Sequence, residues 1–138
     1  MQLWVVFRVG ERRCALPAAA VIEVMRPQPI RAIVRPREGV LGVATIRGAL
    51  LPVVAAAALF GGHVATPTRF ITLRLGDRAV ALAVDEVLGV EPITDVSALP
   101  PLLAEANAGV IEGIGQLDSE LLLLLGTGYL TPFAEDVS

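Results

Sequence analysis

Two segments in the first half of the chain resemble two segments in the second half. The residues F-R-V-G-E-R-R-C-A-L, which begin at Phe7, resemble L-R-L-G-D-R-A-V-A-L, which begin at Leu73. Residues 42–51 match residues 113–122 at a similar spacing along the chain. Apolar strands can resemble one another by chance, but two matches in the same order at nearly equal spacing favour an internal repeat. The repeat predicts two similar lobes.

The local pattern is that of short β-strands joined by turns. Apolar residues alternate or run continuously in residues 3–9, 69–75, 79–84, 111–117 and 121–125. The chain has 13 glycines and 10 prolines, and many of them lie between such runs, where they predict turns. Short helices are expected at residues 55–60 and 102–106, and a single helical turn at residues 18–21. This pattern favours an all-β fold of two small barrels over a helical or parallel-sheet fold.

A length of 138 residues fits a single domain, residues 1–138. The glycine-containing stretch at residues 61–67 is the best internal boundary. We therefore expect lobes at residues 10–66 and 67–130. The first strand, residues 3–9, is a candidate to pair with the second lobe.

The segment from Gly42 to Val54 contains two apolar arms around Arg47-Gly48. A glycine between two β-prone runs predicts a tight hairpin, which places Arg47 at its tip. Arg47 is also the last charged residue before Arg69. It is either a solvated turn residue or a contact for a partner's carboxylate or carbonyl groups.

Composition excludes several classes of function. The net charge of −3 argues against nucleic-acid binding, because that requires a basic face to neutralise phosphates. All 11 basic residues are arginine, which excludes mechanisms that need a lysine. A hydrophobic content of 54% leaves apolar surface for a partner. The longest apolar run, residues 49–60, contains Pro52 and is too short for insertion across a membrane.

The chain offers no catalytic or metal-binding constellation. Cys14 is the only cysteine and His63 the only histidine, so we expect no disulfide, metal or cofactor and a buried, structural thiol. No serine lies in a nucleophile motif, and Asp85 and Glu86, as neighbours on a strand, point to opposite faces. We therefore expect a protein that is not an enzyme. The N-terminus lacks the charged segment of a signal peptide, which indicates the reducing cytoplasm.

Several motifs together resemble the CheW-like domain of bacterial chemotaxis coupling proteins. In chain order they are F-R-V-G-E-R-R-C-A-L-P, V-I-E-V-M-R, G-V-A-T-I-R-G-A-L-L-P-V-V, V-D-E-V and I-E-G-I-G. Each is weak alone, but their order and spacing are specific, and they extend from about Leu3 to Leu130. The resemblance implies two five-stranded, SH3-like β-barrels around a shared apolar core. It also implies a non-enzymatic adaptor that joins the histidine kinase CheA to the cytoplasmic tips of chemoreceptors.

The resemblance also implies a receptor-facing groove. Glu23 in V-I-E-V and Arg47 in T-I-R-G match an acidic and a basic position near this groove, and Val21 matches an apolar position in it. A guanidinium among apolar neighbours needs a carboxylate partner. We therefore expect Glu23 and Arg47 to form a charge-assisted pair.

Two further sets of residues complete the expected sites. Apolar strand edges of the first lobe are expected to be exposed to the regulatory domain of the kinase: Val43, Ile46 and Leu50. Structural roles are expected for Gly42, Gly48, Pro52, Asp85 and Gly113. Of these, Asp85 in V-D-E-V is expected to fix a turn through local backbone hydrogen bonds.

The chain departs from the family pattern at two places. Ala55-Ala56 stand where the family usually has an Asp-Leu pair, and Gly126 stands where it has an aspartate. These departures concern partner affinity rather than the fold, and they leave open a divergent adaptor of a pilus-type or other chemosensory array. The alternative function is a small β-barrel domain that binds an apolar small molecule among residues 121–125 and the alanine segment.

Overall fold

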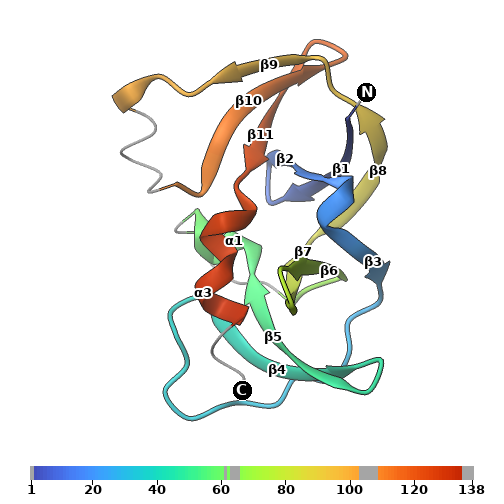
Figure 1. Cartoon of the computed structure of the whole chain (residues 1–138), viewed down its shortest axis with the longest axis vertical. Helices are drawn as coiled ribbons and strands as arrows, with labels where there is room; N and C mark the ends of the chain where they lie inside the picture. The colour runs from blue at the N-terminus through green and yellow to red at the C-terminus, as the bar shows by residue number, and fades with distance from the viewer. Residues whose placement is uncertain (1, 61, 63–65, 103–108, 135–138) are drawn as a thin grey trace.

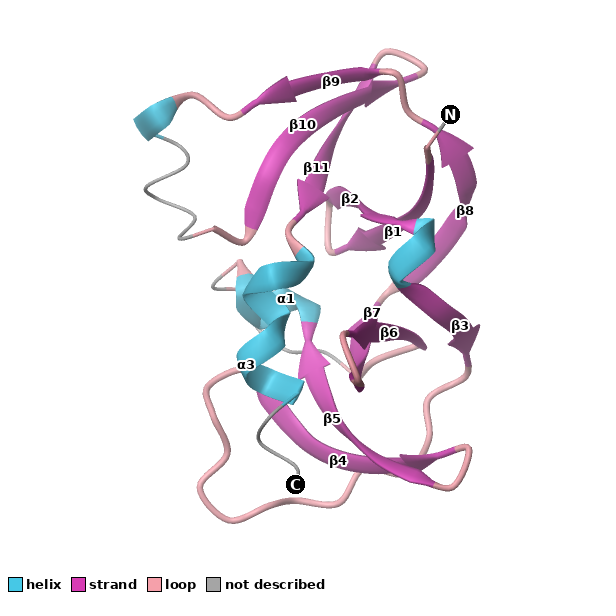
Figure 2. Ribbon diagram, viewed as in Figure 1, coloured by secondary structure: helices cyan, strands magenta, loops and turns pink. Residues whose placement is uncertain are grey.

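The structure, a computed structural model, describes residues 2–60, 62, 66–102 and 109–134. Its strands form two sheets, one above the other in Figure 1, with short helical pieces beside them (Figure 2). The all-β, two-lobed architecture expected from the sequence is confirmed. One of the two sheets has six strands, however, rather than the expected five.

The six-stranded sheet has the strand order β8-β1-β2-β11-β10-β9. Its strands are β1 (Leu3–Val9), β2 (Arg12–Pro17), β8 (Glu86–Pro92), β9 (Asp95–Ala98), β10 (Ile111–Leu117) and β11 (Glu120–Leu125). The five-stranded sheet has the order β3-β6-β7-β5-β4. Its strands are β3 (Val21–Met25), β4 (Val40–Ile46), β5 (Ala49–Ala55), β6 (Arg69–Leu75) and β7 (Arg78–Val84).

The helical pieces whose bounds lie within the described residues are short: η1 (Ala18–Ala20), α1 (Ala56–Leu59), η2 (Thr127–Leu130) and α3 (Thr131–Ala134). The helix expected at residues 55–60 is α1, and Ala55 itself ends β5. The helix expected at residues 102–106 falls, apart from its first residue, outside the described residues.

The two halves of the chain exchange hairpins between the sheets. The first hairpin, β1–β2, pairs with the late strands β8 and β11, whereas the hairpin β6–β7 pairs with the early strands β3 and β5. The sheets therefore do not match the expected lobes at residues 10–66 and 67–130, although the strand at residues 3–9 does pair with β8. The sheets differ from the expected lobes because β2 runs parallel to β11 and β7 runs parallel to β5. Parallel neighbours must come from separate parts of the chain.

The registers of these parallel pairs reproduce the sequence repeat. Ala15 of β2 lies opposite Leu124 of β11, and Ala81 of β7 lies opposite Val53 of β5. The two pairs are equivalent, because the first sequence match aligns Ala15 with Ala81 and the second, continued past its end, aligns Val53 with Leu124. The fold is therefore two copies of one strand arrangement, each completed by a hairpin from the other copy.

A shared apolar core joins the two sheets. Its largest cluster contains buried side chains of both, among them Phe7 and Leu82. Full burial of one such side chain contributes about 1.5–3 kcal/mol. Each sheet also has a cluster of its own, with Phe70 in one and Leu122 in the other. Cys14 belongs to the shared core, and its burial raises the pKa of the thiol to about 12.

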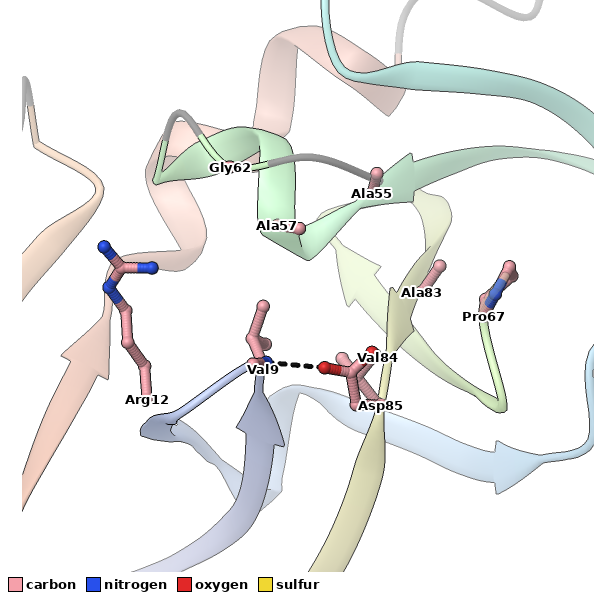
Figure 3. Close-up of a pocket in the computed structure, with 10 residues that line it drawn as sticks. Val9, Arg12, Ala55, Ala57, Gly62, Pro67, Ala83, Val84 and Asp85 are labelled. Atoms are coloured by element: carbon pink, nitrogen blue, oxygen red, sulfur yellow. Dashed lines mark hydrogen bonds between the residues drawn. The ribbon is translucent and has the colours of Figure 1, made fainter. Parts of the chain in front are cut away.

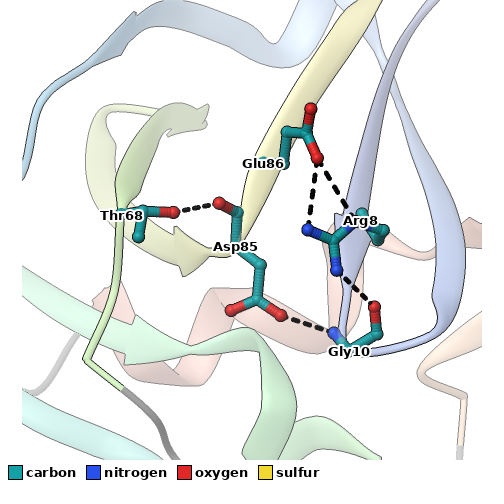
Figure 4. A network of polar contacts seen from close by, with 5 residues as sticks. All are labelled: Arg8, Gly10, Thr68, Asp85 and Glu86. Atoms are coloured by element: carbon teal, nitrogen blue, oxygen red, sulfur yellow. Dashed lines mark hydrogen bonds and ion pairs between the residues drawn. The ribbon is translucent and has the colours of Figure 1, made fainter.

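A network around Asp85 connects the β1–β2 turn to the junction of β7 and β8 (Figure 4). The Asp85 carboxylate accepts a hydrogen bond from the backbone N–H of Gly10 at 2.5 Å, and the Asp85 N–H donates to the carbonyl of Arg8 at 3.1 Å. The Thr68 hydroxyl donates to the Asp85 carbonyl, and Arg8 pairs with Glu86 at 3.1 Å. Asp85 therefore fixes a turn, but one that lies 75 residues away rather than in its own neighbourhood.

At three of the positions expected to be structural, glycine or proline fits a backbone arrangement. Gly42 has a φ of +147°, and a Cβ there would overlap the carbonyl oxygen of Arg31. A Cβ on Gly113 would come within 2.9 Å of a carbonyl oxygen of β9. Pro52 lies opposite Val43, whose N–H and C=O bond to Arg31 instead. The missing N–H of proline therefore removes no hydrogen bond from the β4–β5 ladder.

Candidate functional site

The candidate site begins at the turn between β4 and β5. Arg47 and Gly48 have φ angles of +52° and +81°. Two positive φ angles define a type I′ turn, whose twist suits a two-residue hairpin. Glycine adopts this conformation readily, but arginine does not. The presence of Arg47 at the hairpin tip therefore points to a role for its side chain rather than for its backbone.

The Arg47 guanidinium forms a two-pronged pair with the carboxylate of Glu23 in β3. Arg47 Nε donates to Glu23 Oε1 at 3.0 Å, and a terminal guanidinium nitrogen donates to Oε2 at 2.9 Å. These hydrogen bonds lower the pKa of Glu23 and raise that of Arg47, because each charge stabilises the other. The Arg47 side chain is 77% exposed and that of Glu23 is 26% exposed. Glu23 thus orients a guanidinium that a partner can still reach.

Thr72 holds Glu23 in place from the neighbouring strand β6. The Glu23 N–H donates to Thr72 Oγ1 at 3.1 Å, and the Thr72 hydroxyl donates to the Glu23 carbonyl at 3.2 Å. The register shifts here, so that Ile22 is an extra residue between the paired residues Val21 and Glu23. Thr72 was not among the expected site residues. The signal that could have identified it is a single polar residue inside the apolar run F-I-T-L.

Apolar residues of β3 surround the Glu23 position. Val21 is half-buried and packs against the shared core, whereas Ile22 and Val24 are exposed. β3 is an edge strand of its sheet. The structure therefore combines an exposed apolar strand edge with an oriented guanidinium. That is the chemistry of a surface for a protein partner that offers both apolar side chains and a carboxylate.

The structure corrects the expected exposure of the hairpin's apolar residues. Val43 and Ile46 are only 7% and 4% exposed, whereas Leu50 is 49% exposed. Val43 is covered because the backbone of Arg31 pairs with it across the outer edge of β4. Ile46 packs in the cluster of its own sheet. Of the three, Leu50 alone offers apolar surface to a partner.

A hollow of about 250 Å³ lies where the two sheets meet (Figure 3). Alanines, including Ala55, line much of it, with Arg12 and Asp85 on its walls. The leucines proposed to hold an apolar ligand lie elsewhere, since Leu122 and Leu125 are buried in the apolar clusters. This arrangement gives no particular support to the small-molecule alternative.

The part of the chain that the structure describes holds neither a metal-binding cluster nor a membrane-spanning helix. Within those residues, no three His, Cys, Asp or Glu side chains gather where they could hold a metal ion. Over the same ranges, no helix is long and apolar enough to cross a membrane.

Comparisons with known proteins agree with this architecture. The family model of the CheW-like domain matches residues 3–131. The probable chemotaxis protein CheW of Rhizobium etli is 27% identical over 126 residues, which cover 88% of this chain and 81% of that protein. Protein FrzA of Myxococcus xanthus is 30% identical over 125 residues, which cover 85% of this chain and 78% of that protein.

A solved structure resembles the whole fold. The crystal structure of the scaffolding protein TtCheW from Thermoanaerobacter tengcongensis matches with a TM-score of 0.82 and 25% sequence identity. The match covers 91% of this chain and 88% of TtCheW. Taken with the match of the family model to nearly the whole chain, it shows that this chain belongs to the CheW-like domain family, the non-enzymatic scaffold proteins of chemotaxis.

Proposed function

We propose that this protein is a cytoplasmic adaptor that couples a CheA-type histidine kinase to the cytoplasmic tip of a chemoreceptor. The observation that carries the proposal is the Glu23–Arg47 pair, which orients a guanidinium at an exposed hairpin tip. The apolar edge formed by Ile22 and Val24 lies on the same strand as Glu23. Val24 points to the opposite face of β3 from its neighbour Glu23, so a receptor helix that contacts both the apolar side chains and the guanidinium would lie along the edge of β3.

Charge reversal of the pair tests receptor binding. We expect Glu23→Arg and Arg47→Glu each to weaken binding of a purified receptor tip by about tenfold, and the double swap to restore part of the loss. Binding is measured by isothermal titration calorimetry. The matched control is the same swap in the exposed pair Arg13–Glu120, whose atoms lie 2.7 Å apart in the other sheet.

Two results would contradict receptor binding at this pair. One is a double swap whose effect equals the sum of the single changes, since paired residues must show coupling. The other is an equal loss of binding when the Arg13–Glu120 pair is reversed.

For the kinase, we propose a contact around Leu50 on the β4–β5 hairpin. Leu50 is exposed, and so is Leu121, the residue that the second sequence match aligns with it. We expect Leu50→Asp to weaken binding of the regulatory domain of the kinase by about tenfold or more, because the charge would have to be desolvated in an apolar contact. Leu121→Asp is the matched control. An equal effect of both substitutions would argue against a contact specific to this hairpin.

A further inference from the structure

The connection between β3 and β4, residues 26–39, is strongly basic in an acidic protein. It contains four arginines, Arg26, Arg31, Arg35 and Arg37, and one acid, Glu38. The whole chain has 11 basic and 14 acidic residues, so the remainder carries seven arginines against 13 acids. We call residues 26–39 the basic loop, which runs around the lower edge of the molecule in Figure 1.

Three guanidiniums of the basic loop lack a partner within the described ranges. Arg26, Arg31 and Arg35 are exposed, and none of them forms an ion pair or a side-chain hydrogen bond with a described residue. Arg37 differs, because its guanidinium lies over the ring of Phe133 at 5.8 Å. Among the other described residues, Arg8, Arg13 and Arg47 each pair with a glutamate. The basic loop therefore holds three positive charges, at Arg26, Arg31 and Arg35, that no described residue pairs with.

The backbone of the basic loop is constrained at several positions. Pro27, Pro29 and Pro36 restrict their own φ angles. In the middle of the loop, the N–H and C=O of Arg31 bond to Val43 at 2.8 and 2.9 Å. These constraints reduce the conformational freedom that the loop loses when a ligand binds, which favours binding.

The basic loop also has one exposed apolar side chain at its bend. Val34 is 90% exposed, and the chain bends at Val34 and Arg35, where Arg35 has a φ of +55°. Val34 is the one large apolar side chain that is strongly exposed in this loop, all of which the structure describes. Arginines therefore flank a single apolar contact point.

We propose that the basic loop binds an extended acidic segment of a partner protein. Carboxylates of this acidic segment pair with Arg26, Arg31 and Arg35, and one apolar side chain of the segment packs on Val34. The planar guanidinium matches a carboxylate with two parallel hydrogen bonds. An anionic membrane is a poorer ligand, because a single valine gives little insertion and the rest of the chain is acidic. This surface does not use the Glu23–Arg47 pair, so the proposal is independent of receptor coupling.

The test uses two fluorescein-labelled polyglutamate peptides, one with a central leucine and one with a central serine. We expect the combined variant Arg26→Gln, Arg31→Gln, Arg35→Gln to weaken binding of the leucine peptide at least about tenfold at low salt, measured by fluorescence anisotropy. The matched control replaces Arg12, Arg69 and Arg74 with glutamine. It removes the same charge from exposed sites outside the loop, and we expect it to change affinity less than about twofold.

Val34→Ser tests the apolar contact. It should weaken binding of the leucine peptide about threefold and leave binding of the serine peptide unchanged, because the two apolar side chains are coupled only when both are present. Far-UV circular dichroism of every variant verifies that the fold is retained.

Three results would overturn the proposal. Equal losses from the two triple variants would mean that the net charge alone attracts the peptide. If the leucine peptide binds Val34→Ser as tightly as the wild type, Val34 does not contact the apolar side chain of the peptide. Stronger binding to phosphatidylserine-containing vesicles than to the peptide, lost in the loop variant, would make a membrane surface the ligand instead.

Discussion

Replacing Thr72 with valine removes one hydroxyl and leaves the shape of the side chain almost unchanged. The hydroxyl bonds to both the N–H and the carbonyl of Glu23, at 3.1 and 3.2 Å. Valine can form neither bond, and Thr72 is only 1% exposed, so water cannot readily replace the hydroxyl. The variant therefore removes two hydrogen bonds to backbone groups of β3.

The size of the effect follows from the loss of these two hydrogen bonds. Losing hydrogen bonds to partly buried polar groups costs about 1–3 kcal/mol, and the added methyl group recovers about 0.8 kcal/mol through burial. We expect Thr72→Val to lower the free energy of unfolding by about 1–2 kcal/mol. For a domain of this size that corresponds to a melting temperature lower by about 3–10 °C.

Urea denaturation measures the change in stability, and amide hydrogen exchange measures the local effect at Glu23. Exchange of the Glu23 N–H should become faster in Thr72→Val because its acceptor is lost. Thr72→Ser keeps the hydroxyl and loses a methyl group, so it should cost some stability but retain slow exchange at Glu23. Unchanged stability together with unchanged exchange in Thr72→Val would refute the reasoning. Fast exchange in Thr72→Ser would show that the hydroxyl is not the cause.

Three further predictions rest on other contacts. Pairing with Arg47 lowers the pKa of Glu23 from 4.5. The pair therefore stabilises the fold above pH 4.5, and this stabilisation is lost as the pH falls through the lower pKa of the folded state. The difference in urea midpoint between the wild type and Arg47→Ala should disappear in acid. Burial raises the pKa of Cys14 to about 12, so Ellman's reagent should react with the thiol only as fast as the protein opens; rapid reaction with the native protein would contradict this. Gly42→Ala should cost at least about 2 kcal/mol in urea denaturation, because a Cβ overlaps Arg31, whereas Gly76→Ala, with positive φ but no close neighbour, should cost about half as much.

Features that depend on residues close together in the chain were predictable. A glycine between two apolar runs was enough to place Arg47 at a hairpin tip, and the two matched segments were enough to indicate two similar lobes. The pairing of Glu23 with Arg47 could be expected only through the family resemblance, because 24 residues separate them.

Features that depend on distant strands were not predictable from local pattern. The pattern of apolar residues along a strand does not show that the backbone of Arg31 covers Val43, so Val43 was expected to be exposed. The run F-I-T-L marks Thr72 as a polar residue among apolar ones, but it cannot show that the partner of Thr72 is Glu23, because that residue lies on the distant strand β3. Sequence order likewise assigned β6 and β7 to the second lobe, although they pair with strands of the first.

The exchange of hairpins affects how the chain can fold during synthesis. The five-stranded sheet lacks its central strands until β7, which ends at Val84, has left the ribosome. The hairpin β1–β2 is made first, yet its parallel neighbour β11 is completed only at Leu125. β2 therefore cannot pair with β11 until nearly the whole chain has been synthesised. At a synthesis rate of about 5–20 residues per second, that delay lasts several seconds or more. During that interval the edge of β2 that pairs with β11 is open, so we expect chaperones to bind this hairpin while the chain is being made.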